Sequence, residues 1–121
     1  MKSYTDLEQS KVLVEILPLE SADMYWDYDV QKHEYYPMIM DDQFDDVCIC
    51  AWSLAALLDI LDFPSLTQNK EDEWEVCVFD HDNDNYIEKT AGNPIDACVS
   101  MILDLHKKIC YDFSHITLGK L

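Results

Sequence analysis

The segment from Trp74 to Lys108 constrains the fold most, because it places two strand patterns and one amphipathic helix in direct succession. Residues 74–79 and 86–90 are rich in aromatic and β-branched side chains, and the polar residues 80–85 separate them. Short runs of this composition on either side of a polar turn are typical of paired strands. The sequence therefore predicts a β-hairpin in this part of the chain.

The helix expected after this hairpin has a clear start signal. Asn93 is suited to the N-cap, Pro94 to the first helical position and Asp96 to the positive end of the helix dipole. Apolar residues then recur at spacings of three and four, namely Ile95, Cys98, Val99, Ile102, Leu105 and Ile109. We expect this apolar stripe to pack against the face of a sheet.

Another helix is expected near the start of the chain. Thr5 followed by Glu8 matches a capping box, and the helical pattern ends before Pro18. Its expected buried side consists of Leu7, Leu13, Val14 and Leu17. Residues 12–14 are equally compatible with the beginning of a strand, and the pattern leaves this alternative open.

A first hairpin is expected between these two regions. Large apolar and polar residues alternate over 25–30 and, more weakly, over 35–40. The acidic run 41–46 that follows is expected to be a mobile, solvated loop, since its four carboxylates would repel one another in a buried site.

The middle of the chain contains one further helical pattern. This helix is expected to begin at Ala51 or Ser53 and to end at Asp62. Residues 65–73 lack periodicity and are expected to form a polar linker, and residues 111–121 a tail whose apolar side chains dock on the body.

These elements together predict an α+β fold in the order helix, β-hairpin, helix, β-hairpin, helix. The strands are expected to be antiparallel, with the helices packed on one face of the sheet. A chain of 121 residues with 49% hydrophobic residues is expected to form a single acidic domain over residues 1–121.

The charge of the chain narrows the classes of partner. Eight Lys plus Arg stand against 25 Asp plus Glu, which gives a net charge of −17. A surface of this sign repels phosphate backbones and anionic lipid heads, so we expect no direct nucleic-acid binding and no membrane binding. The charge favours a basic protein or peptide, although it would also serve solubility alone.

The cysteines and the start of the sequence indicate the compartment. Five cysteines are an odd number, and residues 1–6 lead into a charged helical pattern without features of a signal peptide. We therefore expect reduced thiols and a cytoplasmic location, with Cys77 and Cys98 on core faces. No apolar run approaches the roughly 18 residues of a membrane span.

Three motifs carry a resemblance to a known family. They are residues 9–11 with 16–26 (QSK and ILPLESADMYW), residues 51–58 (AWSLAALL) and residues 93–102 (NPIDACVSMI). With these motifs in this order, the chain resembles a family of uncharacterised small proteins from phages and mobile elements of gut Bacteroidetes. The resemblance implies a genomic setting and a host-interaction role, and it implies no activity, ligand or site residue.

Aromatic and acidic residues are concentrated in the first expected hairpin. The candidate binding residues are Trp26, Tyr28, Tyr35, Tyr36, Asp27 and Asp29. Aromatic rings within an acidic frame suit a basic peptide, because they combine anchoring surface with cation–π and charge attraction. The alternative is that half of the rings face the core.

Several other motifs have simpler structural interpretations. Asp80, Asp82 and Asp84 resemble half of a calcium loop, but Ala91 stands where a bidentate Glu is needed, so an exposed turn is favoured. The Cys48-Ile49-Cys50 spacing does not match a zinc site. Ser53 lacks the glycine-flanked elbow of a nucleophile and is expected to be an N-cap. No cofactor is predicted.

The sequence thus supports two classes of function. The first is a non-enzymatic protein-interaction module that binds a basic partner, in its boldest form as a nucleic-acid mimic. The second is a small enzyme, or a small-ligand or weak calcium binder, whose site is formed by distant carboxylates, His or Cys.

Overall fold

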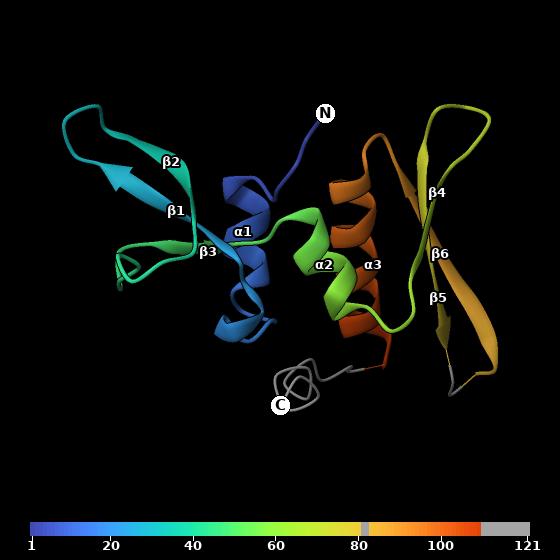
Figure 1. Ribbon diagram of the computed structural model, residues 1–121. Coiled ribbons are helices and arrows are strands. Elements are labelled where there is room, and N and C mark those ends of the chain that lie inside the picture. The colour runs from blue at the N-terminus through green and yellow to red at the C-terminus, as the bar shows by residue number, and fades with distance from the viewer. Residues whose placement is uncertain (81–82, 110–121) are drawn as a thin grey trace.

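The computed structural model describes residues 1–80 and 83–109 (Figure 1). This part of the chain contains three α-helices, one short 3₁₀ helix (η1) and two three-stranded antiparallel sheets. In chain order the elements are α1 (Leu7–Leu13), η1 (Leu19–Ser21), β1 (Met24–Asp29), β2 (Glu34–Ile39), β3 (Ile49–Ala51), α2 (Leu54–Ile60), β4 (Ser65–Gln68), β5 (Trp74–Asp80), β6 (Asn85–Ala91) and α3 (Pro94–Ile109). The α+β class with antiparallel strands is confirmed.

The strands form two separate sheets, with the orders β2-β1-β3 and β4-β5-β6. Figure 1 shows the sheets on opposite sides of the molecule and the helices between them. Helix α1 packs on β3, whereas α3 packs on β5, β6 and α2. This arrangement differs from the expected single sheet with helices on one face, because each hairpin gains a third strand and covers its own side of the helices.

Helix α3 follows the sequence prediction closely at its start. The backbone N–H of Asp96 donates to Oδ1 of Asn93 at 2.9 Å, which is the N-cap geometry expected for Asn93. The predicted apolar stripe is buried from Ile95 to Leu105, and Ala97 and Met101 beside it are fully buried as well. The helix is covered more widely than one sheet requires, because α2 packs against its other side.

The N-cap of α1 lies one residue later than the sequence predicted. Asp6, rather than Thr5, accepts from the backbone N–H of Gln9, and the Gln9 side chain accepts from the backbone N–H of Asp6. The Thr5 side chain is fully buried instead and shares a 2.8 Å hydrogen bond with Ser10. Of the two possibilities for residues 12–14, the helix is confirmed and the strand is not, because α1 extends to Leu13 and Val14 is its C-cap.

Strands β3 and β4 are additions that the sequence did not predict. Strand β3 has only three residues, and β4 is an edge strand whose side chains are mostly exposed, so neither shows a hydrophobic alternation. The linker interpretation of residues 65–73 is wrong for 65–68, which pair with β5. Ser53 caps α2 as expected, and its Oγ accepts from the backbone N–H of Ala56 at 3.2 Å.

The register of β5 corrects the position predicted for Cys77. Val76 and Val78 are buried, so the alternation of the strand turns Cys77 toward the other face of the sheet, between Ser65 and Glu88 on the neighbouring strands. Cys98 is fully buried in α3 as predicted, and burial raises the pKa of its thiol to about 12.

The core runs through the helix layer and contacts both sheets. Its buried apolar residues form a cluster that extends from Leu13 through Trp52 and Leu57 to Val76. The indole Nε1 of Trp52 donates to Oγ of Ser21 at 3.0 Å, so the one polar atom of this ring is satisfied inside the core.

No helix between residues 1–80 or 83–109 combines the length and the apolar character that crossing a bilayer requires. The predicted docking of the 111–121 tail lies outside the described residues.

Candidate functional site

The hairpin β1–β2 contains all six candidate binding residues, and its register divides them between two faces. Trp26 pairs with Pro37, Asp27 with Tyr36 and Tyr28 with Tyr35. Successive side chains of a strand point to opposite faces. One face, which we call the Trp26 face, therefore carries Trp26, Tyr28 and Tyr35, and the other, the Asp27 face, carries Asp27, Asp29 and Tyr36.

On the Trp26 face, the indole of Trp26 is held by the N-terminal segment. Its ring meets the ring of Tyr4 edge to face, with centroids 5.8 Å apart. Its Nε1 donates to the backbone carbonyl oxygen of Thr5 at 3.3 Å. Trp26 is thus half-buried, and part of its surface serves packing rather than binding.

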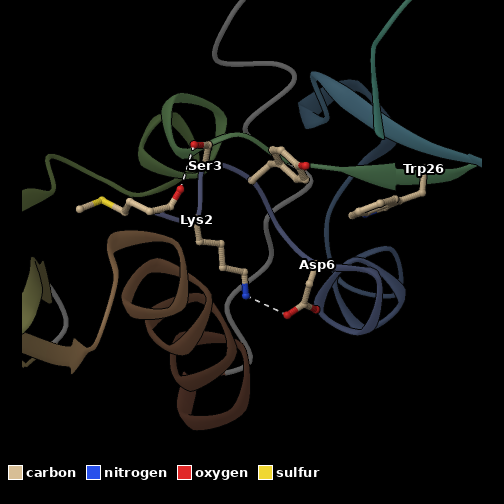
Figure 2. Close-up of a pocket in the computed structure, with 6 residues that line it drawn as sticks. Lys2, Ser3, Asp6 and Trp26 are labelled. Carbon is tan, nitrogen blue, oxygen red and sulfur yellow. Dashed lines mark hydrogen bonds and ion pairs between the residues drawn. The ribbon is translucent and has the colours of Figure 1, made fainter. Parts of the chain in front are cut away.

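An open hollow of about 360 Å³ lies beside Trp26 (Figure 2). Residues 1–4 and Asp6 form the rest of its wall. The ammonium of Lys2 lies 2.8 Å from Oδ2 of Asp6 and 2.8 Å from Oδ1 of Asp96, so the carboxylate of Asp6 at this hollow is already paired with an internal cation.

The ion pairs of Lys2 join the starts of α1 and α3. Partial burial alone would raise the pKa of Asp96, but hydrogen bonds from Lys2, Gln9 and Asn93 outweigh it, and this pKa lies below its usual range. Burial would also raise the pKa of Asp6, but hydrogen bonds from Lys2 and from the backbone of Gln9 outweigh it, and this pKa is lowered as well. The hollow beside Trp26 is therefore part of a structural junction between helices.

Farther along the Trp26 face, Tyr28 and Tyr35 form a ring pair with centroids 5.0 Å apart. The hydroxyl of Tyr28 lies 3.5 Å from Nδ1 of His33 in the hairpin turn. Tyr28 is 38% exposed, so one ring of the pair remains accessible from solvent.

The Asp27 face combines an accessible ring with a carboxylate. The hydroxyl of Tyr36 donates to Oδ2 of Asp27 at 3.1 Å, and Tyr36 is 39% exposed. The thiol of Cys48 donates to Oδ1 of the same carboxylate at 3.6 Å. The hydrogen bond to Asp27 is the main cause that raises the pKa of the Tyr36 phenol, and burial raises it further. The phenol therefore stays protonated beside the carboxylate.

Asp29, the last candidate residue, shapes the hairpin turn. Its Oδ1 accepts from the backbone N–H groups of Gln31 at 2.9 Å and Lys32 at 3.2 Å. This is the local side-chain to backbone bonding that Asp provides in turns. The carboxylate still adds negative charge to the Asp27 face.

A second hollow, of about 310 Å³, opens between the end of α1, η1 and the segment 44–50. We call it the Phe44 hollow. Val14, Leu19, Phe44 and Ile49 supply apolar surface, and Asp45 and Asp46 supply carboxylates. Cys48, which also lines it, connects it to Asp27 of the hairpin.

The wall of the Phe44 hollow is held in place by hydrogen bonds. The Phe44 ring meets the buried Tyr25 ring edge to face, with centroids 5.5 Å apart. The hydroxyl of Tyr25 donates to Oδ1 of Asp41 at 2.7 Å, and the thiol of Cys48 donates to Oδ1 of Asp45 at 3.4 Å. The acidic run is therefore exposed at its carboxylates, as expected, but anchored at its ends.

The Cys48 thiol is protonated at neutral pH in this setting. Burial raises its pKa, and the nearby carboxylates of Asp45 and Asp27 raise it further. A neutral thiol has one S–H to share between the two carboxylates, whereas a thiolate would repel both. The arrangement is that of a structural link rather than of a nucleophile.

The sequence did not predict the Phe44 hollow, although one signal was present. Phe44 is the single apolar residue in the acidic run 41–46, and an isolated aromatic ring in such a run indicates a contact with the body. Val14 and Leu19 had no comparable signal, because Val14 was expected on a buried helix side and Leu19 belongs to no periodic pattern.

The structure also places the residues considered for other chemistry. Asp80 accepts from Nδ2 of Asn83 at 2.6 Å within the β5–β6 turn, and Asp84 adopts a left-handed φ of 52°, as expected for an Asp in a turn. Asp82 lies outside the described residues. Ser53 donates a very short hydrogen bond to Asp23 and serves as N-cap.

The described geometry contains no cluster of candidate metal ligands. Within residues 1–80 and 83–109, no three His, Cys, Asp or Glu side chains gather closely enough to hold a metal ion. Calcium binding and a small-molecule site remain predictions from the sequence.

Comparisons with known proteins give no relative to transfer a function from. No protein-family model, curated protein or solved structure matches the chain. We therefore infer a function from the geometry of the chain itself.

Proposed function

We propose that this protein is a non-catalytic interaction module that binds a basic protein or peptide through the Asp27 face and the adjoining Phe44 hollow. The observation that carries the proposal is the contact between these two surfaces through Cys48, which makes one continuous acidic and apolar region. A basic segment requires carboxylates that pair with its charges and rings or hollows that anchor its side chains.

The charge distribution around this region supports a basic partner. Residues 20–50 contain one lysine, Lys32, against nine acidic residues. The acidic residues are Glu20, Asp23, Asp27, Asp29, Glu34, Asp41, Asp42, Asp45 and Asp46. Attraction of this density accelerates encounter with a cationic partner and repels anionic ones.

The uncommitted carboxylates of the acidic run add to this support. Asp42 and Asp46 are exposed and make no hydrogen bond or ion pair with any residue that the structure describes. They are available to a partner without first losing an internal contact. By contrast, Asp6 at the other hollow is paired with Lys2, so that hollow is less suited to a cation.

The biological setting belongs to the same proposal. The four cysteines within the described residues, at positions 48, 50, 77 and 98, are free thiols, which suits a reducing cytoplasm. The resemblance to phage and mobile-element proteins makes a host protein with a basic nucleic-acid-binding surface a suitable partner. A nucleic-acid mimic would present carboxylates where phosphates otherwise lie.

A titration with model peptides tests the proposal. The probe is a peptide of about ten residues composed of Lys, Ser and Gly, and the control has Glu in place of Lys. We expect the Lys peptide alone to bind, and its affinity to fall steeply between about 50 and about 300 mM salt, because exposed charges are screened. Absence of binding at low salt, or binding that ignores salt, would contradict the proposed function.

A further inference from the structure

We propose that the Phe44 hollow takes one bulky apolar side chain of the basic partner, while lysines next to that side chain pair with Asp45 and Asp46. This inference rests on the proposed function. It adds that the partner must carry an apolar anchor, which binding by charge attraction alone would not require. The expected recognition sequence is thus a Leu, Met or Phe flanked by Lys or Arg.

The apolar surface at the mouth of the hollow is accessible. Leu19 is 53% exposed and Val14 is 39% exposed, although both line the hollow. The floor is different, since Cys50 is buried and Phe44 is packed on Tyr25. An incoming side chain would therefore meet a fixed floor and cover the two exposed residues.

The charges at the hollow favour a basic peptide over other occupants. Asp45 and Asp46 stand at its wall, and no Lys or Arg is among the described residues that line it. A second copy of this chain would bring another net charge of −17 to the same place. A cationic segment with an apolar anchor neutralises the carboxylates and fills the hollow together.

The hollow is also prepared for binding before the partner arrives. Oδ1 of Asp45 accepts from the backbone N–H of Val47 at 3.1 Å and from the thiol of Cys48. Oδ1 of Asp41 accepts from the Tyr25 hydroxyl and from the backbone N–H of Gln43 at 2.9 Å. A loop fixed at both ends loses little conformational freedom on binding, which favours affinity.

The decisive experiment compares two peptides on the unaltered protein. Both contain several lysines in Ser and Gly, and one has a central Leu where the other has Ser. At about 150 mM salt we expect the Leu peptide to bind about tenfold more tightly or better, as burial of one aliphatic side chain predicts. Equal, salt-dependent binding of both peptides would overturn the anchor and leave the proposed function standing. Binding of neither peptide, at this salt or at about 50 mM, would overturn both.

Matched variants locate the effect. Val14→Ser with Leu19→Ser removes apolar surface from the hollow, and we expect it to abolish the advantage of the Leu peptide. Val12→Ser is the control, because Val12 is 48% exposed on α1 and does not line the hollow. Loss of the advantage in both variants, or in neither, would contradict the inference.

Alkylation of cysteines provides a second readout that needs no variant. Cys48 lines the hollow, whereas Cys77 is on the other sheet, and both thiols are half-buried with raised pKa values. We expect the Leu peptide to slow alkylation of Cys48 several-fold at mildly alkaline pH and to leave Cys77 unchanged. Equal protection of both thiols, or sedimentation showing that Val14 and Leu19 instead hold two copies together, would overturn the inference.

Discussion

At the scale of single residues, Lys2 has more structural consequence than its position near the start of the sequence suggests. Its ammonium contacts carboxylates at the start of two helices that are far apart in the sequence. Partial burial would lower the pKa of Lys2, but its hydrogen bonds to Asp6 and Asp96 outweigh burial and raise it. The junction is therefore fully charged over the range between ordinary carboxyl and lysine pKa values.

Asp96→Asn tests this junction through the pH dependence of stability. The pKa of Asp96 is lower in the folded state than in the unfolded state, so its contribution is complete above about pH 4 and is lost as pH falls through the folded-state pKa. We expect the variant to lose roughly 0.5–1 kcal/mol near neutral pH, since the carboxylate is partly exposed. The loss should disappear in strong acid.

Urea unfolding measured at several pH values checks this prediction. Asp42→Asn is the matched control, because Asp42 is exposed and has no partner within the described residues. A constant difference between the Asp96 variant and the unaltered protein at all pH values would show that the ionised pair is not its source.

Thr5 is a second residue whose role differs from its sequence interpretation. Its Oγ1 accepts from the backbone N–H of Trp52 at 3.1 Å and bonds the Ser10 hydroxyl, all in the interior. We expect Thr5→Val to lower the free energy of unfolding by about 1–3 kcal/mol, because it leaves buried polar groups without a partner.

The control for Thr5 is Ser3→Ala, which removes an exposed hydroxyl and should change stability by less than about 0.5 kcal/mol. Thermal or urea denaturation of both variants provides the comparison. A Thr5→Val protein as stable as the unaltered one would show that the network relaxes around the lost hydroxyl.

At the scale of elements, the β1–β2 hairpin shows why a cluster in sequence need not be a cluster in space. Trp26, Asp27 and Tyr28 are consecutive, and a strand sends Asp27 to the face opposite its neighbours. The sequence prediction of one aromatic and acidic surface is thereby divided into two surfaces of different composition. The Asp27 face adjoins the Phe44 hollow through Cys48.

Tyr28 and Tyr36 offer a matched pair of variants, because their exposed fractions are 38% and 39% and they lie on opposite faces. We expect Tyr36→Ser to weaken binding of a lysine-rich peptide about two- to fivefold, the range of an exposed cation–π contact. Tyr28→Ser should leave the affinity unchanged. Fluorescence titration of both variants distinguishes the faces, and the reverse ranking would assign binding to the Trp26 face.

The success of sequence-based prediction also varies by element. The β5–β6 hairpin and α3 were predictable, because β-branched alternation, the Asn93-Pro94 start and a strong apolar stripe agree with one another. Strands β3 and β4 were not, since a three-residue strand and a polar edge strand are defined by their partners rather than by their own residues. The α1 cap was misplaced because Thr5 and Asp6 are both good N-cap residues.

At the scale of the whole molecule, charge and core act in opposite directions. The core cluster holds the helices together, while a net charge of −17 places mutually repelling carboxylates around it. Self-repulsion of this size destabilises the compact state and is weakened by salt. Asp27, Asp29 and Tyr36 of the candidate site were named from the sequence. The Phe44 hollow could be predicted only in its charge, because it joins residues from distant parts of the sequence.

The effect of salt on thermal stability tests this balance. We expect the melting temperature to rise by several degrees between about 20 and about 500 mM sodium chloride, because screening relieves repulsion in the folded state more than in the expanded one. Differential scanning fluorimetry measures it. A melting temperature that falls with salt would mean that favourable ion pairs, such as those of Lys2, outweigh the repulsion.

The outer edge of the β1–β2 hairpin affects whether many copies of the protein associate with one another. Strand β2 is an edge of its sheet, and Pro37 lies within it. A proline interrupts the row of amide donors that an incoming strand would need. At the crowded concentrations reached during overexpression, we therefore expect the protein to stay dispersed rather than to grow into fibrils from this edge.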